Sequence, residues 1–242
     1  MPEPASPAAE KVAIVVGGGS GIGAACVREF AGNGYRVVAM SPSGRARTLA
    51  ESLGGAGVDG SNTSVDDLRA CVELAVSRYG RVDAVVNSSG HAARGPVLEI
   101  TDEQWAEGAD LYLMNVVRMA RVVTPHLIAS GGGAIVNIST AGVFEPGPMF
   151  PVSVTMRAAL ASFTKLYADE YGPRGIRMNN LLTGLTKDDP SVVPAEWTSG
   201  IPLRRAQSTA EAARVVRFLA GAESAYLTGQ NIRVDGGETR SV

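Results

Sequence analysis

The chain has 242 residues, 45% hydrophobic side chains and a formal net charge of −2, which favours one globular domain and gives no sign of a nucleic-acid or anionic membrane partner. Its longest apolar runs have the length of strands, so no segment is expected to span a bilayer. Residues 1–10 carry neither a basic start nor an apolar core, which excludes a signal peptide and predicts a frayed tail before a single domain at 11–242 of a soluble, cytoplasmic protein.

The first half of the domain is predicted to alternate strands with helices. An apolar run ends in a cluster of glycines and then turns into a helical pattern, and the same alternation repeats along the chain. The predicted elements in this half are a strand at 12–16, a helix at 24–30, strands at 36–40 and 54–59, a helix at 65–79 and a strand at 81–86.

The second half continues this alternation. Thr101 is predicted to cap a helix, and the further predicted elements are a long helix at 111–130, a strand at 134–139, a helix at 152–171, a strand at 177–182, an irregular stretch at 183–205, a helix at 210–220 and a strand at 231–234. Strands separated by helices pair in parallel through right-handed crossovers. The sequence therefore predicts an α/β fold, a Rossmann-type doubly wound parallel sheet of about seven strands with helices on both faces.

The two cysteines, Cys26 and Cys71, fall on predicted helices without the spacing of a metal or redox site. We expect both to be buried free thiols, as in a reducing compartment. No metal site is predicted.

A cluster of glycines lies between the first predicted strand and the first predicted helix. Glycine is needed there because a Cβ atom would keep the backbone from approaching a diphosphate. The free N–H groups and the positive end of the helix dipole attract the same anion. We therefore predict that a dinucleotide binds this turn through Gly17, Gly19, Ser20, Gly21, Ile22 and Gly23.

The ends of the other predicted strands carry further small and polar residues. Parallel strands end at one edge of the sheet, so these residues are expected to share a crevice with the glycine turn. They are Ser41, Asn87, Ser88, Ser89, Gly90, Ser139, Thr140, Thr183 and Gly184.

Five segments together form a family pattern. They are the glycine turn at 17–23, Asn87-Ser88-Ser89-Gly90, Asn115 on the long helix, the strand residues 135–140, and 226–230 with 234–237 near the C-terminus. With these segments the chain resembles the short-chain dehydrogenase/reductase family over residues 11–240. The resemblance implies an oxidoreductase with a nicotinamide dinucleotide, a small-molecule substrate and a mobile substrate lid at about 184–205. It also implies a homo-oligomer, a dimer or tetramer, formed through the helices at 111–130 and 152–171 and the last strand.

The family's catalytic Tyr-x-x-x-Lys pair is replaced in this chain. Ser153 and Arg157 occupy the two positions, and no tyrosine occurs between Tyr112 and Tyr167. In the family the phenol protonates the developing alkoxide, and an aliphatic hydroxyl is a weaker acid by about 6 pKa units, or about 8 kcal/mol. The spacing of four places Ser153 and Arg157 on one helix face, so Arg157 is expected to hydrogen-bond the ribose hydroxyls of the coenzyme. The other catalytic positions that the resemblance implies are Asn115, Ser139 and Thr140.

Coenzyme preference depends on the residue that ends the second strand. A carboxylate there binds the 2′-hydroxyl of NAD, whereas this chain has Ser41, followed by Arg45 and Arg47. We therefore predict a preference for NADP(H), with NAD(H) as the alternative if the arginines are solvated loop residues. By resemblance Asp59 is expected to contact adenine; an ordinary strand-end turn is the alternative.

Two residues are candidates for the missing proton donor. His91 follows the loop after the fourth strand and titrates near neutral pH, and Glu145 in the loop after the fifth strand is second. For His91 the alternative is a rim residue without a chemical role.

Three functions follow from these observations. The first is reduction of a small carbonyl, enone or imine by NADPH with a non-standard proton donor. The others are a dinucleotide-binding protein without turnover, acting as a sensor or partner subunit, and a non-redox lyase or isomerase with His91 or Glu145 as base. The retained Asn115, Ser139 and Thr140 favour the reductase, because a binding module does not need them.

Overall fold

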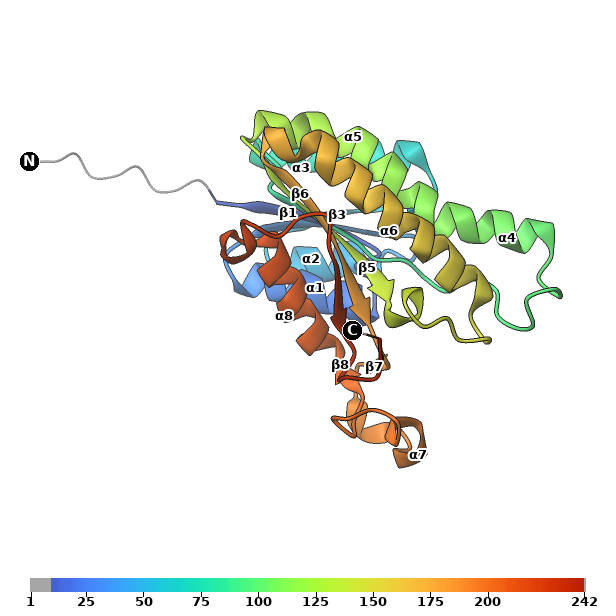
Figure 1. The fold of residues 1–242 in the computed structure, drawn as a ribbon. Helices are drawn as coiled ribbons and strands as arrows, with labels where there is room; N and C mark the ends of the chain where they lie inside the picture. Colours follow the sequence, from blue (N-terminus) through green and yellow to red (C-terminus); the bar gives the residue numbers. More distant parts are fainter. Residues whose placement is uncertain (1–9, 242) are drawn as a thin grey trace, which may run out of the picture.

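A seven-stranded parallel sheet forms the centre of the protein (Figure 1). The computed structural model describes residues 10–241, so the predicted tail lies outside this range except for Glu10. The sheet has the order β3-β2-β1-β4-β5-β6-β9 and consists of β1 (Val12–Val16), β2 (Arg36–Ser41), β3 (Ala56–Asp59), β4 (Ala84–Asn87), β5 (Gly133–Thr140), β6 (Ile176–Thr183) and β9 (Asn231–Val234). The strand order reverses between β1 and β4, which is where such sheets bind ligands. The predicted fold class is confirmed.

Helices cover both faces of the sheet (Figure 1). They are α1 (Gly21–Gly32), α2 (Arg45–Ser52), α3 (Val65–Tyr79), α4 (Asp102–Ala109), α5 (Asn115–Ala129), α6 (Pro151–Tyr171), α7 (Ala195–Thr198) and α8 (Thr209–Ala220). Buried residues of α1, α2 and α8 form one apolar core with the sheet, and those of α3, α5 and α6 contribute to the other. Every residue of β1 is buried, since its alternate side chains enter the two cores. This explains its unbroken apolar sequence.

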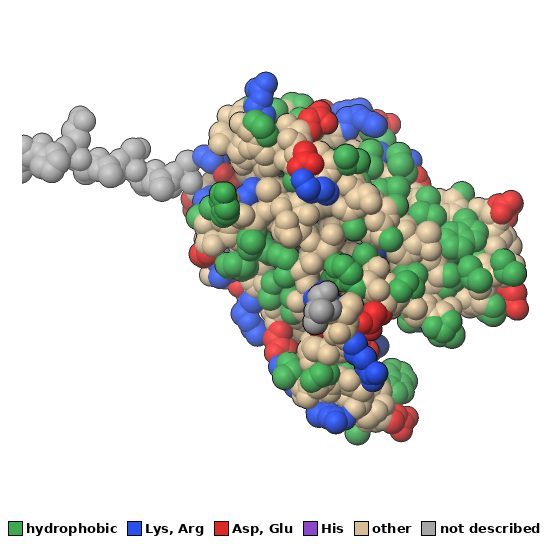
Figure 2. Space-filling view, viewed as in Figure 1, with side chains coloured by type: hydrophobic (Ala, Val, Ile, Leu, Met, Phe, Trp, Pro, Cys, Tyr) green, Lys and Arg blue, Asp and Glu red, His purple; other side chains and the backbone are tan. Residues whose placement is uncertain are grey.

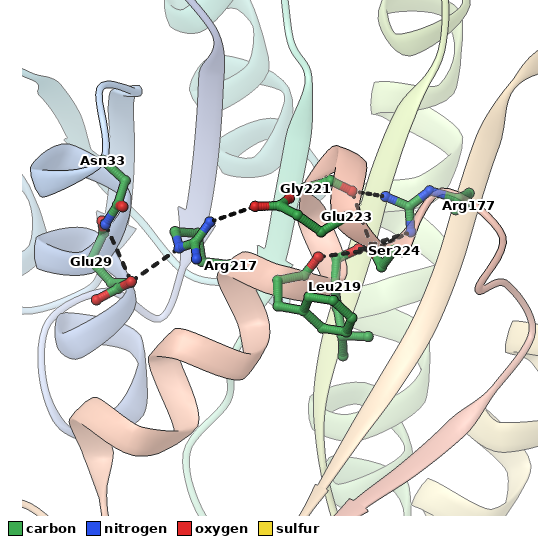
Figure 3. Close-up of polar contacts among 9 residues, drawn as sticks. Glu29, Asn33, Arg177, Arg217, Leu219, Gly221, Glu223 and Ser224 are labelled. Carbon is green, nitrogen blue, oxygen red and sulfur yellow. Dashed lines mark hydrogen bonds and ion pairs between the residues drawn. The ribbon is translucent and has the colours of Figure 1, made fainter.

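Helices α1 and α8 lie side by side and are joined by a charged pair (Figure 3). Arg217 of α8 bonds Glu29 of α1 at 3.1 Å, and its other nitrogen reaches Glu223 at 3.4 Å. At the end of α8, Arg177 of β6 donates hydrogen bonds to the carbonyl oxygens of Leu219 and Gly221. These carbonyls lack partners within the helix, so Arg177 stabilises the C-terminus of α8 against the sheet.

Asparagine side chains form a ladder across four strands, buried on β4, β5 and β6 and partly exposed on β9. Asn87, Asn137, Asn180 and Asn231 lie in register on β4, β5, β6 and β9, and each donates from Nδ2 to the Oδ1 of the next at 2.8–2.9 Å. Thr164 of α6 adds a hydrogen bond to Asn180 at 3.0 Å. The ladder therefore ties the central strands together beneath the carboxyl edge of the sheet.

The structure differs from the predicted elements in three places. Helix α2 was not predicted; only its residues Ala46 and Ala50 are buried. The helix expected at 111–130 already begins at Asp102, with Thr101 and Gln104 forming the predicted cap, and contains a π-helical turn (Asp110–Met114). The stretch expected to be irregular contains α7 and the strand β7 (Thr186–Lys187), which pairs with β8 (Gln207–Ser208).

Both cysteines are buried and free, as predicted. Burial raises the pKa of each thiol, that of Cys71 to about 12.

Candidate active site

The glycine turn connects β1 to α1 in the conformation that the sequence predicts. Gly17 has a φ of +72°, and a Cβ atom there would lie 2.3 Å from the carbonyl oxygen of Ser88. A Cβ on Gly23 would lie 2.1 Å from the carbonyl oxygen of Gly17. Both contacts are shorter than any packed carbon tolerates, so these two glycines allow α1 and the loop after β4 to approach the turn.

The open side of the turn fits a diphosphate. Gly21 has a φ of +53°, and a Cβ built on it meets no atom within 4 Å. Ser20 is exposed, partly exposed Ile22 follows Gly21, and α1 begins at Gly21 without a side-chain cap. The start of α1 therefore leaves N–H groups without a side-chain cap beside open space at Gly21, which is the chemistry that an anionic dinucleotide requires.

Beside the turn lies an open pocket of about 680 Å³, lined among others by Gly19, Arg28, Ser43, Arg45 and Asp59. A Cβ on Gly19 would lie 2.8 Å from the Ser41 hydroxyl. Ser41 is buried, and its Oγ accepts a hydrogen bond from the N–H of Ala46 at 3.1 Å, so this hydroxyl holds the start of α2 in place.

Asp59 lies in the same pocket but is paired with an arginine. Arg47 bonds both carboxylate oxygens of Asp59, at 3.0 and 3.1 Å, and this contact lowers the pKa of the carboxyl. Arg45 donates to the Ser43 hydroxyl at 3.2 Å and makes no ion pair within residues 10–241. The sequence did not predict the pairing of Arg47 on α2, because its partner Asp59 lies on β3.

The loop after β4 contacts the glycine turn from the other side. The Asn87 side chain belongs to the asparagine ladder, Ser88 packs against Gly17, and Ser89 is partly exposed. The carbonyl of Gly90 accepts a hydrogen bond from the Tyr112 hydroxyl. The expected approach of this loop and the turn is therefore present, although the Asn87 side chain is engaged within the sheet.

Ser153 and Arg157 form a bonded pair on α6. The Arg157 guanidinium donates to the Ser153 hydroxyl at 2.6 Å, which confirms that they share a helix face. Burial lowers the pKa of Arg157, and the neighbouring Tyr112 partly offsets that shift. An arginine remains protonated even so, so the site contains a permanent cation.

Two buried polar atoms near the strand ends have no hydrogen-bond partner within the described residues. They are Oγ of Ser139 on β5 and Oδ1 of Asn115 at the start of α5. Thr140 differs, because its hydroxyl accepts the N–H of Gly142 at 3.3 Å. A buried polar group without a partner is costly, so Ser139 and Asn115 are suited to bind a ligand.

The two predicted replacements for the proton donor lie in different surroundings. The exposed His91 has a lowered pKa, first through desolvation and then through the charges of Arg94, Arg157 and Lys187. Its imidazole is therefore neutral at pH 7 and suited to accept a proton. Glu145 is also exposed, and its Oε1 accepts the N–H groups of Arg240 and Ser241, each at 2.7 Å. Glu145 thus anchors the C-terminal segment.

Tyr112 is a site residue that the sequence analysis missed. It lies in the π-helical turn three residues before Asn115, is buried, and packs its ring against the Arg157 guanidinium. Turns of this kind occur frequently at functional sites. The only signal in the sequence was an aromatic residue close to Asn115, which is equally typical of a core position.

The predicted lid, residues 184–205, projects from the body of the molecule around α7 (Figures 1 and 2). Gly184 lies against Asp235 at its base, and Arg205 at its end bonds Glu211 of α8 at 2.7 Å, which lowers the pKa of that carboxyl to about 2. Val192, Trp197 and Leu203 are more than half exposed. The segment predicted to be the lid therefore exposes apolar side chains and is held at its two ends by the contacts of Gly184 and Arg205.

Sequence comparison relates this chain to known oxidoreductases. A family model described as enoyl-(acyl carrier protein) reductase matches residues 16–239. Oxidoreductase UcpA from Salmonella typhimurium is 31% identical over 95% of this chain and 94% of its own length. The 3-oxoacyl-[acyl-carrier-protein] reductase FabG from Thermotoga maritima is 32% identical over 94% of this chain and 97% of its own.

Solved structures show the same similarity. An NADPH-bound short chain oxidoreductase from Pseudomonas aeruginosa PAO1, described as containing an atypical catalytic center, has 30% identity and a TM-score of 0.88, covering 96% of this chain and 98% of its own. Acetoin dehydrogenase from Enterobacter cloacae has 26% identity and a TM-score of 0.85, covering 96% of each chain. Within residues 10–241, no helix has the length and apolar character to cross a membrane. The chain belongs to the short-chain dehydrogenase/reductase family, a family of nicotinamide-dependent oxidoreductases.

Proposed function

We propose that the protein uses NADPH to reduce a small carbonyl, enone or imine compound, with a proton donor other than the tyrosine of the family. The observation that carries this proposal is the unpartnered Ser139 hydroxyl, buried one residue before the end of β5; the Ser153–Arg157 pair on α6 supports it. A hydroxyl in that position stabilises the oxygen on which negative charge develops during reduction. Arg157 would hold the ribose hydroxyls of the coenzyme, which supplies the hydride when bound.

The arginines near the end of β2 support a preference for NADP(H). The pocket there contains Arg28 and Arg45, neither of which forms an ion pair within the described residues, while Arg47 is compensated by Asp59. No carboxylate ends β2, since Ser41 is the last residue. A 2′-phosphate would therefore meet two uncompensated cations and no opposing charge on that strand. The related Pseudomonas aeruginosa structure contains NADPH.

This preference predicts the effect of removing Arg45. NADPH is expected to bind about tenfold more tightly than NADH, and Arg45→Ala is expected to remove most of that difference, since one charge-assisted hydrogen bond contributes about 1.5 kcal/mol. Fluorescence titration of both coenzymes measures this directly. Arg174→Ala, which removes an exposed arginine elsewhere, is the matched control and should leave both affinities unchanged. Equal affinities in the wild type would refute the preference.

Turnover is tested separately. With the enzyme in excess of NADPH, single-turnover assays against ketones, enones and cyclic imines are expected to show loss of absorbance at 340 nm with at least one class. Binding of NADPH without oxidation by any class would instead support the dinucleotide-binding protein without turnover. The hydrogen bonds between the Glu145 carboxylate and the C-terminal segment do not favour Glu145 as the base of a non-redox lyase or isomerase.

Assembly into a dimer or tetramer stays a prediction. Leu166 on α6 is 67% exposed, and α6 is one of the helices through which the family is expected to associate. Light scattering of the purified protein checks this expectation.

A further inference from the structure

Tyr112 places a phenol beside the Ser153–Arg157 pair. Tyr112 is only 3% exposed, and the guanidinium carbon of Arg157 lies 4.1 Å from the centre of the Tyr112 ring. The hydroxyl reaches the loop after β4, where it accepts a hydrogen bond from the N–H of Ala92 at 2.8 Å and donates to the carbonyl of Gly90 at 3.3 Å. The phenol thus lies between a permanent cation and the loop expected to line the nicotinamide side of the crevice.

The two hydrogen bonds of this hydroxyl differ in strength. Bonds from O–H to oxygen are most often about 2.7–2.8 Å long, so the 3.3 Å bond to Gly90 holds the phenolic proton loosely. The 2.8 Å bond from Ala92 instead supports the oxygen itself. When the proton leaves, the oxygen becomes negative, and both the Ala92 N–H and the Arg157 cation stabilise that charge. The surroundings of Tyr112 therefore provide two partners for the phenolate oxygen once the proton has been transferred.

The other candidates are less suited to donate a proton. His91 is neutral at pH 7, because desolvation and three nearby cations lower its pKa. Glu145 is engaged elsewhere, because its Oε1 accepts the backbone N–H groups of Arg240 and Ser241. Ser153 offers an aliphatic hydroxyl, which is far less acidic than a phenol.

We propose that Tyr112 is the proton donor of the reduction, in place of the tyrosine that the family has at the position of Ser153. This inference rests on the proposed reductase function. As the substrate carbon accepts a hydride from NADPH, the electron pair of the C=O π bond moves to the oxygen, which takes the proton of Tyr112. The phenolate that remains is paired with Arg157 until water returns a proton. The ketone becomes an alcohol, NADPH becomes NADP⁺, and one proton is consumed from solvent.

Tyr112→Phe tests this role, because it keeps the ring on Arg157 and removes only the hydroxyl. At saturating NADPH, reduction of a ketone is expected to become about 100-fold slower, the lower range for general acid catalysis. Reduction of a preformed cyclic iminium ion, which needs no proton, is expected to change less than twofold. The NADPH dissociation constant, measured by fluorescence, should also stay within twofold.

The control is Tyr167→Phe, which removes another buried phenol, one bonded to Thr124 at 2.6 Å. It should leave both rates unchanged. Equal loss with ketone and iminium, no loss with ketone, or a wild type that reduces only the iminium would each overturn the role of Tyr112. A wild type that oxidises no NADPH would instead refute the proposed function. If Tyr112→Phe fails to fold, Tyr112→Trp, which also removes the hydroxyl and keeps an aromatic ring, replaces it and should slow the ketone far more than the iminium.

Discussion

Replacing Gly23 with alanine is expected to weaken coenzyme binding about 100-fold and to destabilise the fold. The added Cβ would lie 2.1 Å from the carbonyl oxygen of Gly17, and neither backbone segment can move without displacing the turn. Overpacking of this kind costs about 3 kcal/mol, and a shift of about 1 Å in a binding turn reduces binding or activity about 100-fold. Urea unfolding and NADPH titration of the variant measure the two effects.

Gly32→Ala is the matched control for this substitution. Gly32 is the last residue of the same helix, and a Cβ built on it meets no atom within 4 Å. Alanine is favoured over glycine in helices by about 1 kcal/mol at most, so this variant should be as stable as the wild type or slightly more stable. NADPH binding by Gly23→Ala at wild-type affinity would show that the turn does not hold the diphosphate.

Asn180→Leu is expected to lower the free energy of unfolding by about 4 kcal/mol. Asn180 is completely buried. Its Oδ1 accepts hydrogen bonds from Asn137 at 2.9 Å and Thr164 at 3.0 Å, and its Nδ2 donates to Asn231 at 2.8 Å. Leucine fills a similar volume but leaves these groups without their partner, and each buried polar group left unpaired costs about 1–3 kcal/mol. The midpoint and slope of urea unfolding provide the measurement.

Asn33→Leu is the comparison for the ladder. Asn33 is exposed at the end of α1, where its amide bonds Glu29, so its replacement should cost less than about 1 kcal/mol. Similar losses for the two variants would mean that the ladder contributes no more than an exposed hydrogen bond.

Much of the fold follows from local patterns in the sequence. The apolar run of β1 predicted a buried strand correctly, because both faces of that strand are buried. The glycine turn was predictable because Gly17 and Gly23 leave no room for a side chain. Helix α2 escaped prediction because only two alanines of its eight residues are buried. Two small residues give too weak an apolar pattern to distinguish a helix from a loop.

The site was predictable where neighbours in the chain determine it. Ser153 and Arg157 are four residues apart on one helix, so their contact follows from helix geometry. Tyr112 meets Arg157 only because the π-helical turn and α6 pack together, and Glu145 meets a segment 95 residues further along the chain. Such contacts depend on tertiary packing, which no local spacing encodes.

Two hydrogen bonds connect Glu145, in the loop after β5, to the C-terminal residues Arg240 and Ser241. One carboxylate oxygen of Glu145 accepts hydrogen bonds from two successive backbone amides, at Arg240 and Ser241. The centre of the adjacent Phe144 ring lies 5.2 Å from the guanidinium carbon of Arg233. If the segment around Glu145 moves away from the crevice, residues 240 and 241 must move with it, or the two hydrogen bonds of Glu145 must break. A dye attached at position 241 would consequently report on movement of the segment around Glu145.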